Sequence, residues 1–212
     1  MKFQFLASVL LFSFLLPSYS SAHPHSWIEM KTEIVGSDGN VNGFKMEWTF
    51  DAMTSAYMLD GYDLSKEKKA ESLQKVADLV INNMYAEHYF TFFYDDLTPI
   101  RYKTAVDAKL TKKKAKATLS FYLPLSKPQK AIGKSLKLLI FEPSYYVDMS
   151  WNKKSDIVLS KALQAVCSLT LDEPNPTAEQ MNYALLLPTD SDPDNALGQL
   201  FTQTARLNCL NR

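Results

Sequence analysis

A strict alternation of apolar and polar side chains constrains this fold more than any other feature of the chain. In residues 27–34 and 44–51, one set of alternate positions is mainly apolar and the other is mainly charged or polar. Because strand side chains point to opposite faces in turn, each stretch predicts a strand with one buried face. The glycine-containing stretch 36–40 lies between them, so the sequence predicts an N-terminal β-hairpin.

The remaining pattern predicts further strands and a few helices. Residues 115–123 alternate as cleanly as the hairpin, and a helix is expected over 66–85 with Ser65 as its cap. Shorter strands are expected at 88–94, 100–107, 136–141, 145–151, 163–171 and 202–210, and short helices at 177–187 and 195–201. We therefore expect a single α+β domain with a mainly antiparallel, sandwich-like β-sheet, one long helix and short C-terminal helices. The repeated βαβ units of a two-lobed solute receptor are absent from the sequence.

Residues 1–22 have the three parts of a secretory signal peptide. Lys2 gives a positive start, residues 3–16 are apolar, and small residues stand at Ser20 and Ala22, the positions that signal peptidase reads. The apolar run is short for a membrane span, although an uncleaved anchor is the alternative. We expect cleavage after Ala22, a mature domain over 23–212 and a periplasmic location.

Two cysteines, Cys167 and Cys209, lie in the expected mature domain. An even number of cysteines in an exported protein indicates a disulfide bond, and each cysteine falls in a predicted strand. A metal site built on both cysteines is the alternative, but no CxxC spacing supports it. We expect a disulfide between neighbouring strands.

Charge and motif content argue against several classes of function. The chain has 23 Lys and Arg against 23 Asp and Glu, so there is no electrostatic basis for binding nucleic acid. It has no GxSxG, no HExxH and no glycine-rich phosphate loop. We expect that the protein is not an enzyme, and we assign no catalytic residue.

The segment His23-Pro24-His25 holds two of the three histidines of the chain. After cleavage at Ala22, His23 would carry a free α-amine beside two imidazoles, and such nitrogen donors suit zinc, copper and nickel. Pro24 has no N–H to deprotonate, so the usual amide-based copper chelate is blocked. A terminus with two exposed histidines and no metal is the alternative.

A metal held by two imidazoles needs further ligands, which carboxylates from elsewhere in the fold could supply. Asp148 and Asp51 are the leading candidates because both lie near predicted strand ends. The other candidates near strand ends, and the remaining imidazole, are Asp60, Asp63, Glu142 and His88. A calcium loop at 59–65 is rejected because it is too short and lacks the bidentate glutamate.

Taken together, these features resemble a known family of periplasmic proteins. The motifs that carry the resemblance are Ala22 to Trp27, Glu47 to Asp51, Tyr89 to Thr91, Glu142 to Asp148, and Cys167 with Cys209. The family was long of unknown function and is described as the periplasmic component of an uncharacterised ABC-type transport system. The chain also resembles the periplasmic zinc-uptake protein ZevA. The resemblance implies a partner in the inner membrane, either a nickel/cobalt-type permease or an ABC-type metal permease.

The leading hypothesis is a metal-binding accessory protein for uptake of a divalent transition metal, with zinc first and nickel, cobalt or copper after it. His23 and His25 would be ligands, and Asp148 or Asp51 would supply oxygen. Binding should weaken in acid, because only neutral imidazole binds metal. One alternative is a non-metal interaction module that docks on a membrane transporter. Another is a copper-handling redox protein that uses a histidine brace at its terminus.

Overall fold

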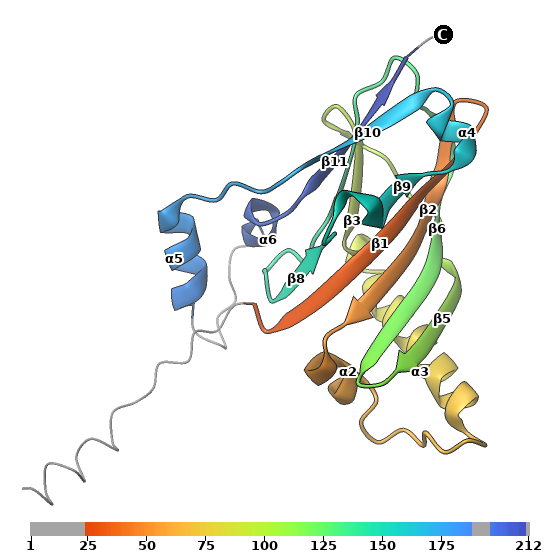
Figure 1. The fold of residues 1–212 in the computed structure, drawn as a ribbon, viewed down its shortest axis with the longest axis vertical. Coiled ribbons are helices and arrows are strands. Elements are labelled where there is room, and N and C mark those ends of the chain that lie inside the picture. The colour runs from red at the N-terminus through yellow and green to blue at the C-terminus, as the bar shows by residue number, and fades with distance from the viewer. Residues whose placement is uncertain (1–23, 188–195, 211–212) are drawn as a thin grey trace, which may run out of the picture.

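Two β-sheets share one hydrophobic core in the computed structural model, which describes residues 24–187 and 196–210 (Figure 1). The larger sheet has the order β5-β6-β2-β1-β8, with β9 also paired to β1. Its strands are β1 (Ser26–Ser37), β2 (Asn40–Phe50), β5 (Val106–Lys113), β6 (Lys116–Lys130), β8 (Val147–Ser150) and β9 (Ile157–Leu159). The smaller sheet has the order β10-β11-β7-β3-β4. Its strands are β3 (Thr91–Asp95), β4 (Thr98–Pro99), β7 (Leu136–Ile140), β10 (Cys167–Asp172) and β11 (Thr204–Cys209).

The N-terminal hairpin is confirmed. Strands β1 and β2 pair antiparallel, with Ile28 opposite Phe50 and Ile34 opposite Phe44. The alternate residues that the sequence assigned to the apolar face are buried, whereas Glu29 and Lys31 between them are exposed. The lysine-rich segment near residue 114 is the turn of the next hairpin, between β5 and β6.

Two short strands pair parallel with β1, which the sequence pattern did not predict. Strand β8 aligns with the start of β1, with Trp27 opposite Asp148, and β9 aligns with its second half. The sheets are otherwise antiparallel, so the expected α+β class with mainly antiparallel strands is confirmed in a single domain.

The core lies between the inner faces of the two sheets and the helix α3 (Lys69–Met84). The rings of Phe44 on β2 and Phe93 on β3 meet edge to face at 5.1 Å, which joins the sheets. Helix α3 packs behind the larger sheet (Figure 1), and its Gln74 side chain donates to the carbonyl of Ala108 on β5 at 2.9 Å. Its buried residues include Leu73, Val76, Ala77, Ile81 and Met84.

The helices differ from the expected set. The described residues contain five α-helices, so the description of one long helix with short C-terminal ones is too simple: α2 (Ala52–Met58), α3, α4 (Lys161–Gln164), α5 (Ala178–Leu186) and α6 (Leu197–Leu200). Helix α2 was not predicted at all. Ser65 does not cap α3, because the helix begins only at Lys69. The backbone N–H of Ser65 instead donates to the Asp63 carboxylate at 2.8 Å.

Two predicted strands are shorter than expected. The segment expected as a strand at 88–94 opens with the left-handed turn η2 (His88–Phe90), and β3 starts only at Thr91. The segment expected at 100–107 forms a single bridge, Tyr102 to Leu125, before β5 starts at Val106.

The C-terminal region follows its prediction except at the start of the strand expected at 163–171, where α4 ends at Gln164 and β10 begins only at Cys167. Cys167 and Cys209 are directly opposite on β10 and β11 and form the expected disulfide. Helix α5 begins with a capping box in which Thr177 and Gln180 bond reciprocally. The predicted signal peptide and the loop at 188–194 lie outside the described residues. Among those residues, no helix has the length and apolar composition that crossing a membrane requires.

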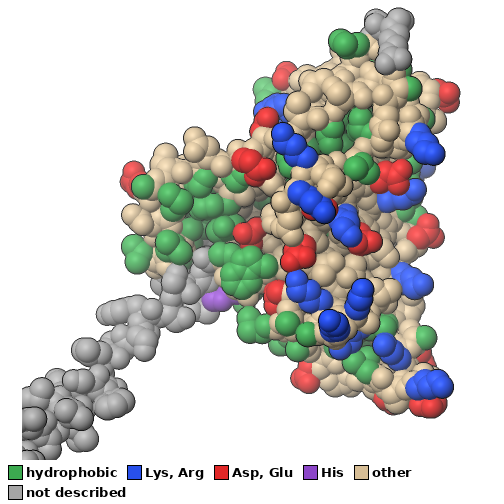
Figure 2. Space-filling model, viewed as in Figure 1, with side chains coloured by type: hydrophobic (Ala, Val, Ile, Leu, Met, Phe, Trp, Pro, Cys, Tyr) green, Lys and Arg blue, Asp and Glu red, His purple; other side chains and the backbone are tan. Residues whose placement is uncertain are grey.

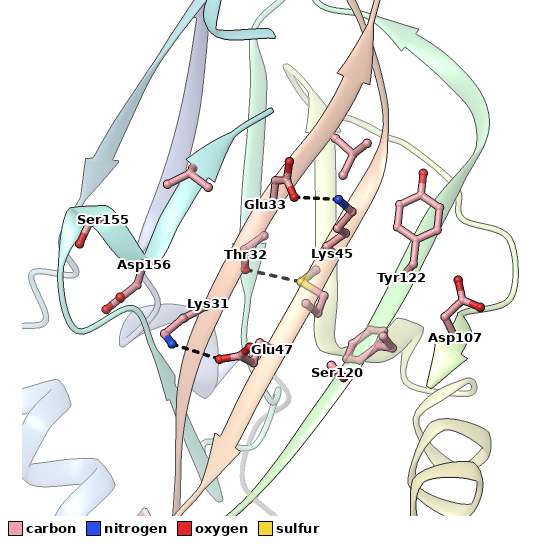
Figure 3. Close-up of a pocket in the computed structure, with 14 residues that line it drawn as sticks. Lys31, Thr32, Glu33, Lys45, Glu47, Asp107, Ser120, Tyr122, Ser155 and Asp156 are labelled. Atoms are coloured by element: carbon pink, nitrogen blue, oxygen red, sulfur yellow. Dashed lines mark hydrogen bonds and ion pairs between the residues drawn. The ribbon is translucent and has the colours of Figure 1, made fainter. Parts of the chain in front are cut away.

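The outer face of the larger sheet is charged, and its charges pair with each other. Figure 3 shows Lys31 bonded to Glu47 at 3.1 Å and Lys45 bonded to Glu33 at 3.0 Å, across β1 and β2. These residues border a shallow hollow of about 580 Å³. Exposed cross-strand pairs of this kind stabilise the register of the hairpin by about 0.2–1 kcal/mol each. We therefore interpret this face as a solvated sheet surface.

Candidate metal site at the start of strand β1

The expected ligands lie around the first residues of β1. His23 is outside the described residues. His25 immediately precedes β1, and its backbone N–H donates to the carbonyl of Tyr146 at 2.9 Å. The imidazole of His25 lies against the Tyr146 ring, with centroids 4.6 Å apart. These two contacts hold His25 against the loop that precedes β8.

Pairing between β1 and β8 brings His25 and Asp148 to one face. Ser26 is aligned with Val147 and Trp27 with Asp148. Residues aligned in a parallel ladder point to the same side of the sheet, and residues two apart share a face. Ile28 and Met149 point into the core, so His25, Trp27 and Asp148 lie on the outer face.

The carboxylate of Asp148 is partly buried and receives no hydrogen bond from any described residue. Removal from water disfavours the charged form, so burial raises the pKa of Asp148 above its usual value. Tyr145 lies in the loop before β8, and burial, followed by repulsion from Asp148, raises the pKa of Tyr145 to about 12. A half-buried carboxylate with no donor is available to a cation.

Asp51 has the opposite environment. Its Oδ1 accepts hydrogen bonds from the backbone N–H groups of Met53 at 2.8 Å and Thr54 at 2.9 Å. Its Oδ2 accepts from Trp27 N at 3.0 Å, Thr54 Oγ1 at 2.6 Å and Ser26 Oγ at 3.3 Å. Burial alone would raise the pKa of Asp51, but these bonds outweigh it and lower the pKa to about 2.

These contacts identify Asp51 as the N-cap of α2. The Asp51 carboxylate also connects the start of β1 to that helix, because it accepts hydrogen bonds from Ser26 Oγ and the Trp27 N–H. Its oxygens are occupied by donors, so a metal would have to displace bonds that hold the fold. Of the two predicted carboxylates, the geometry favours Asp148 as the ligand.

Glu142 shapes the loop that leads into β8. Its carboxylate accepts from the Ser144 N–H at 2.9 Å and the Tyr146 N–H at 2.7 Å. Helix α6 packs against this loop, and the Gly198 N–H donates to Pro143 O at 2.8 Å. The backbones are so close that a Cβ at position 198 would lie 2.0 Å from Glu142 O, so only glycine fits there. Glu142 therefore positions the segment that carries Tyr146 and Asp148.

The other acidic and histidine candidates lie elsewhere in the fold. Asp60 and Asp63 lie in the exposed loop between α2 and α3, and hydrogen bonds from the Ser65 backbone and side chain lower the pKa of Asp63. His88 lies in η2, next to β3 of the smaller sheet. Across the described part of the chain, no group of three or more His, Cys, Asp or Glu side chains is arranged to hold a metal ion. A complete site therefore needs a ligand from outside these residues, and His23 is the predicted one.

Two contributors to this region were missed from the sequence. Tyr146 contacts His25, and the Tyr145 ring stacks on Phe201 beside α6 at 4.1 Å. The consecutive tyrosines beside Asp148 were the only available signal. Their importance depends on the parallel pairing of β8 with β1, which no local pattern reveals.

Comparison with known proteins gives the family of this chain. The family described as "Protein of unknown function (DUF1007)" matches residues 8–209. The chain belongs to the DUF1007 family. An uncharacterised protein of Haemophilus influenzae (strain KW20 / Rd) is 31% identical over 191 residues, which cover 89% of this chain and 91% of that protein. The DUF1007 match spans both sheets and includes the β1–β8 region described above.

Proposed function

We propose that this protein is a periplasmic metal-binding accessory protein for the uptake of a divalent transition metal, zinc first. In this proposal His23, His25 and Asp148 bind the ion, while Asp51 and Glu142 hold the surrounding backbone. Nickel, cobalt and copper remain alternative ions. The proposed partner is an inner-membrane permease of the nickel/cobalt or ABC type, as the resemblance to metal-uptake proteins implies.

The observation that carries the proposal is the environment of Asp148. A partly buried carboxylate without donors raises the free energy of the folded protein, and a group perturbed in this way is a candidate for a binding site. Asp148 is aligned with Trp27, two residues beyond His25, and therefore lies on the same face as His25. Imidazole and carboxylate together are a common donor set for zinc. The disulfide supports an oxidising location such as the periplasm.

The test is native mass spectrometry of protein purified from the periplasm without chelator. It reports the mature N-terminus and any retained metal in one spectrum. The proposal predicts a chain that starts at His23 and carries one zinc ion. A metal-free chain that also fails to bind added zinc, copper and nickel would contradict it.

A second candidate function is docking on a membrane transporter without any metal. Helix α5 favours it because it stands apart from both sheets and exposes an apolar surface (Figures 1 and 2). The exposed residues are Met181, Tyr183, Leu185 and Leu186. This alternative predicts that deletion of residues 23–26 leaves docking on the transporter unchanged. It also predicts that a Met181→Ser, Leu186→Ser variant no longer docks. The metal-binding proposal predicts loss of zinc uptake after that deletion.

A further inference from the structure

A cavity of about 670 Å³ lies between the end of α3, the turn η2, strand β3 and residues 99–103. Its aromatic residues are of two kinds. The rings of Tyr89, Phe93 and Tyr102 pack into the core, whereas Tyr85 is exposed and Phe92 and Tyr94 are partly exposed. The volume falls in the range that holds small organic ligands, roughly 300–1,000 Å³, and aromatic walls bind flat ring systems by stacking.

Three nitrogen-bearing side chains line this cavity, His88, Arg101 and Lys103. None of the described residues that line it is acidic. All three side chains are exposed, and none forms an ion pair or hydrogen bond with a described residue. On the outer face of the larger sheet, Lys31 and Lys45 are paired with glutamates, whereas the three donors of this cavity form no such pair and lie beside aromatic side chains.

The wall of the cavity includes a strained backbone turn. His88, Tyr89 and Phe90 have φ values of 51°, 55° and 51°, in the left-handed region that favours glycine. L-residues rarely adopt this conformation, because Cβ then lies too close to the following carbonyl oxygen. The surrounding structure holds the turn: Ala105 N–H donates to the Tyr89 hydroxyl at 3.1 Å, and Phe141 N–H donates to Phe90 O at 2.9 Å.

Strain of this kind is typical of ligand sites, where it fixes side chains in one arrangement. Here it buries the Tyr89 ring beside Phe121 and leaves the His88 imidazole exposed at the cavity. A glycine at position 88 would relieve strain, but it would remove the imidazole. The turn therefore supports a role for the cavity that goes beyond packing.

We infer that this cavity binds a small aromatic carboxylate. The ring system would stack on the exposed surfaces of Tyr85, Phe92 and Tyr94, and the carboxylate would pair with Arg101 and Lys103, with His88 as a further donor. Charge-assisted hydrogen bonds to a carboxylate are the strong contacts in such a complex. The site is separate from the proposed metal site, and it uses none of its ligands.

The probe is 2-naphthoate, titrated by isothermal calorimetry into the full mature chain. Its neutral analogue, 2-naphthalenemethanol, has the same ring system without the charge. We expect saturable binding of naphthoate and at least about ten-fold weaker binding of the alcohol, since one charged contact is worth about 1.4 kcal/mol or more. Equal affinity for the two compounds, or no saturable binding of naphthoate, overturns the inference.

The variant is Arg101→Gln, Lys103→Gln, and the matched control is Lys66→Gln, Lys69→Gln, which removes the same charge from exposed, unpaired lysines near the start of α3. We expect the first variant to bind naphthoate at least about ten-fold more weakly and the control to stay within about two-fold of the parent. A different role for the two cations is to neutralise the carboxyl end of α3. In that case the variant loses thermal stability and keeps its naphthoate affinity, which overturns the inference.

Discussion

Two carboxylates flank Trp27 at the start of β1 and have opposite environments. On one side, Asp51 caps α2, accepts hydrogen bonds on both oxygens and bonds to the Trp27 N–H. On the other side, Asp148 is aligned with Trp27 on β8 and receives no hydrogen bond from a described residue. The pKa of Asp51 is lowered to about 2 by its donors, whereas burial raises the pKa of Asp148.

The difference separates an acid that stabilises the fold from one that destabilises it. A carboxylate whose charged form is hydrogen-bonded favours the folded state at neutral pH, and one that is buried without donors disfavours it. Natural proteins keep destabilising groups where they bind or react. The comparison therefore assigns Asp51 to structure and makes Asp148 the preferred carboxylate of the proposed metal site, although the sequence made them equal candidates.

The largest expected effect concerns the histidines on the Asp148 side. A His23→Ala, His25→Ala variant should lose at least about 100-fold in zinc affinity, because two of the proposed ligands are removed. Competition with a chromogenic chelator at pH 7 measures it. The control is His88→Asn, which removes an exposed imidazole elsewhere in the fold and should leave the affinity unchanged. Unchanged affinity in the double variant would remove the histidines from the site.

The next effect concerns the structural side of the comparison. Asp51→Asn should lower the free energy of unfolding by about 1–2 kcal/mol, because the cap of α2 and the bonds to β1 are weakened. Urea unfolding at pH 7 measures it. Asp60→Asn, on the exposed loop after α2, is the matched control and should stay within about 0.5 kcal/mol of the parent. An equal loss in both variants would show that the Asp51 contacts are unimportant.

Asp148→Asn should change stability in the opposite direction. Without metal, the amide removes a buried charge, so the free energy of unfolding should rise by on the order of 1 kcal/mol at pH 7. The same urea experiment, with chelator present, measures it. A destabilised Asp148→Asn protein would mean that the carboxylate has a structural partner after all.

The smallest effects lie in the pH dependence, where the two acids should again differ in sign. Asp51 has a lowered folded pKa of about 2 against an ordinary value of 3.8, so its stabilisation is present above pH 3.8 and is lost as the pH falls through 2. The folded pKa of Asp148 is raised, so its destabilisation is present at neutral pH and disappears in acid. The gap between parent and Asp148→Asn should therefore close before the gap between parent and Asp51→Asn does. Unfolding midpoints from pH 7 to pH 2 measure the order.

Much of the fold could be predicted because local patterns specify it. The alternation in β1 and β2 and the disulfide between β10 and β11 were both visible in the sequence. Helix α2 was missed because its seven residues carry too short an apolar pattern, although Asp51 is a favoured capping residue. Local propensity also favoured a strand at 88–90, where tertiary contacts hold a left-handed turn.

The site was predicted only in part, for a physical reason. The sequence named His25, Asp51 and Asp148, but it could not rank the two acids, because their difference lies in donors supplied by distant residues. The parallel pairing of β8 with β1 joins residues more than a hundred positions apart, and no local pattern encodes such a pairing. Tyr146 was missed for the same reason.

Zinc titration of Asp148→Asn and Asp51→Asn, side by side in the processed chain at pH 7, separates the proposed ligand from the structural acid. We expect Asp148→Asn to bind zinc at least about ten-fold more weakly than the parent, since a charged ligand is lost. Folded Asp51→Asn should keep the parent affinity within about two-fold. Parent-like affinity in Asp148→Asn, together with loss of affinity in Asp51→Asn, would exchange the roles of the two acids.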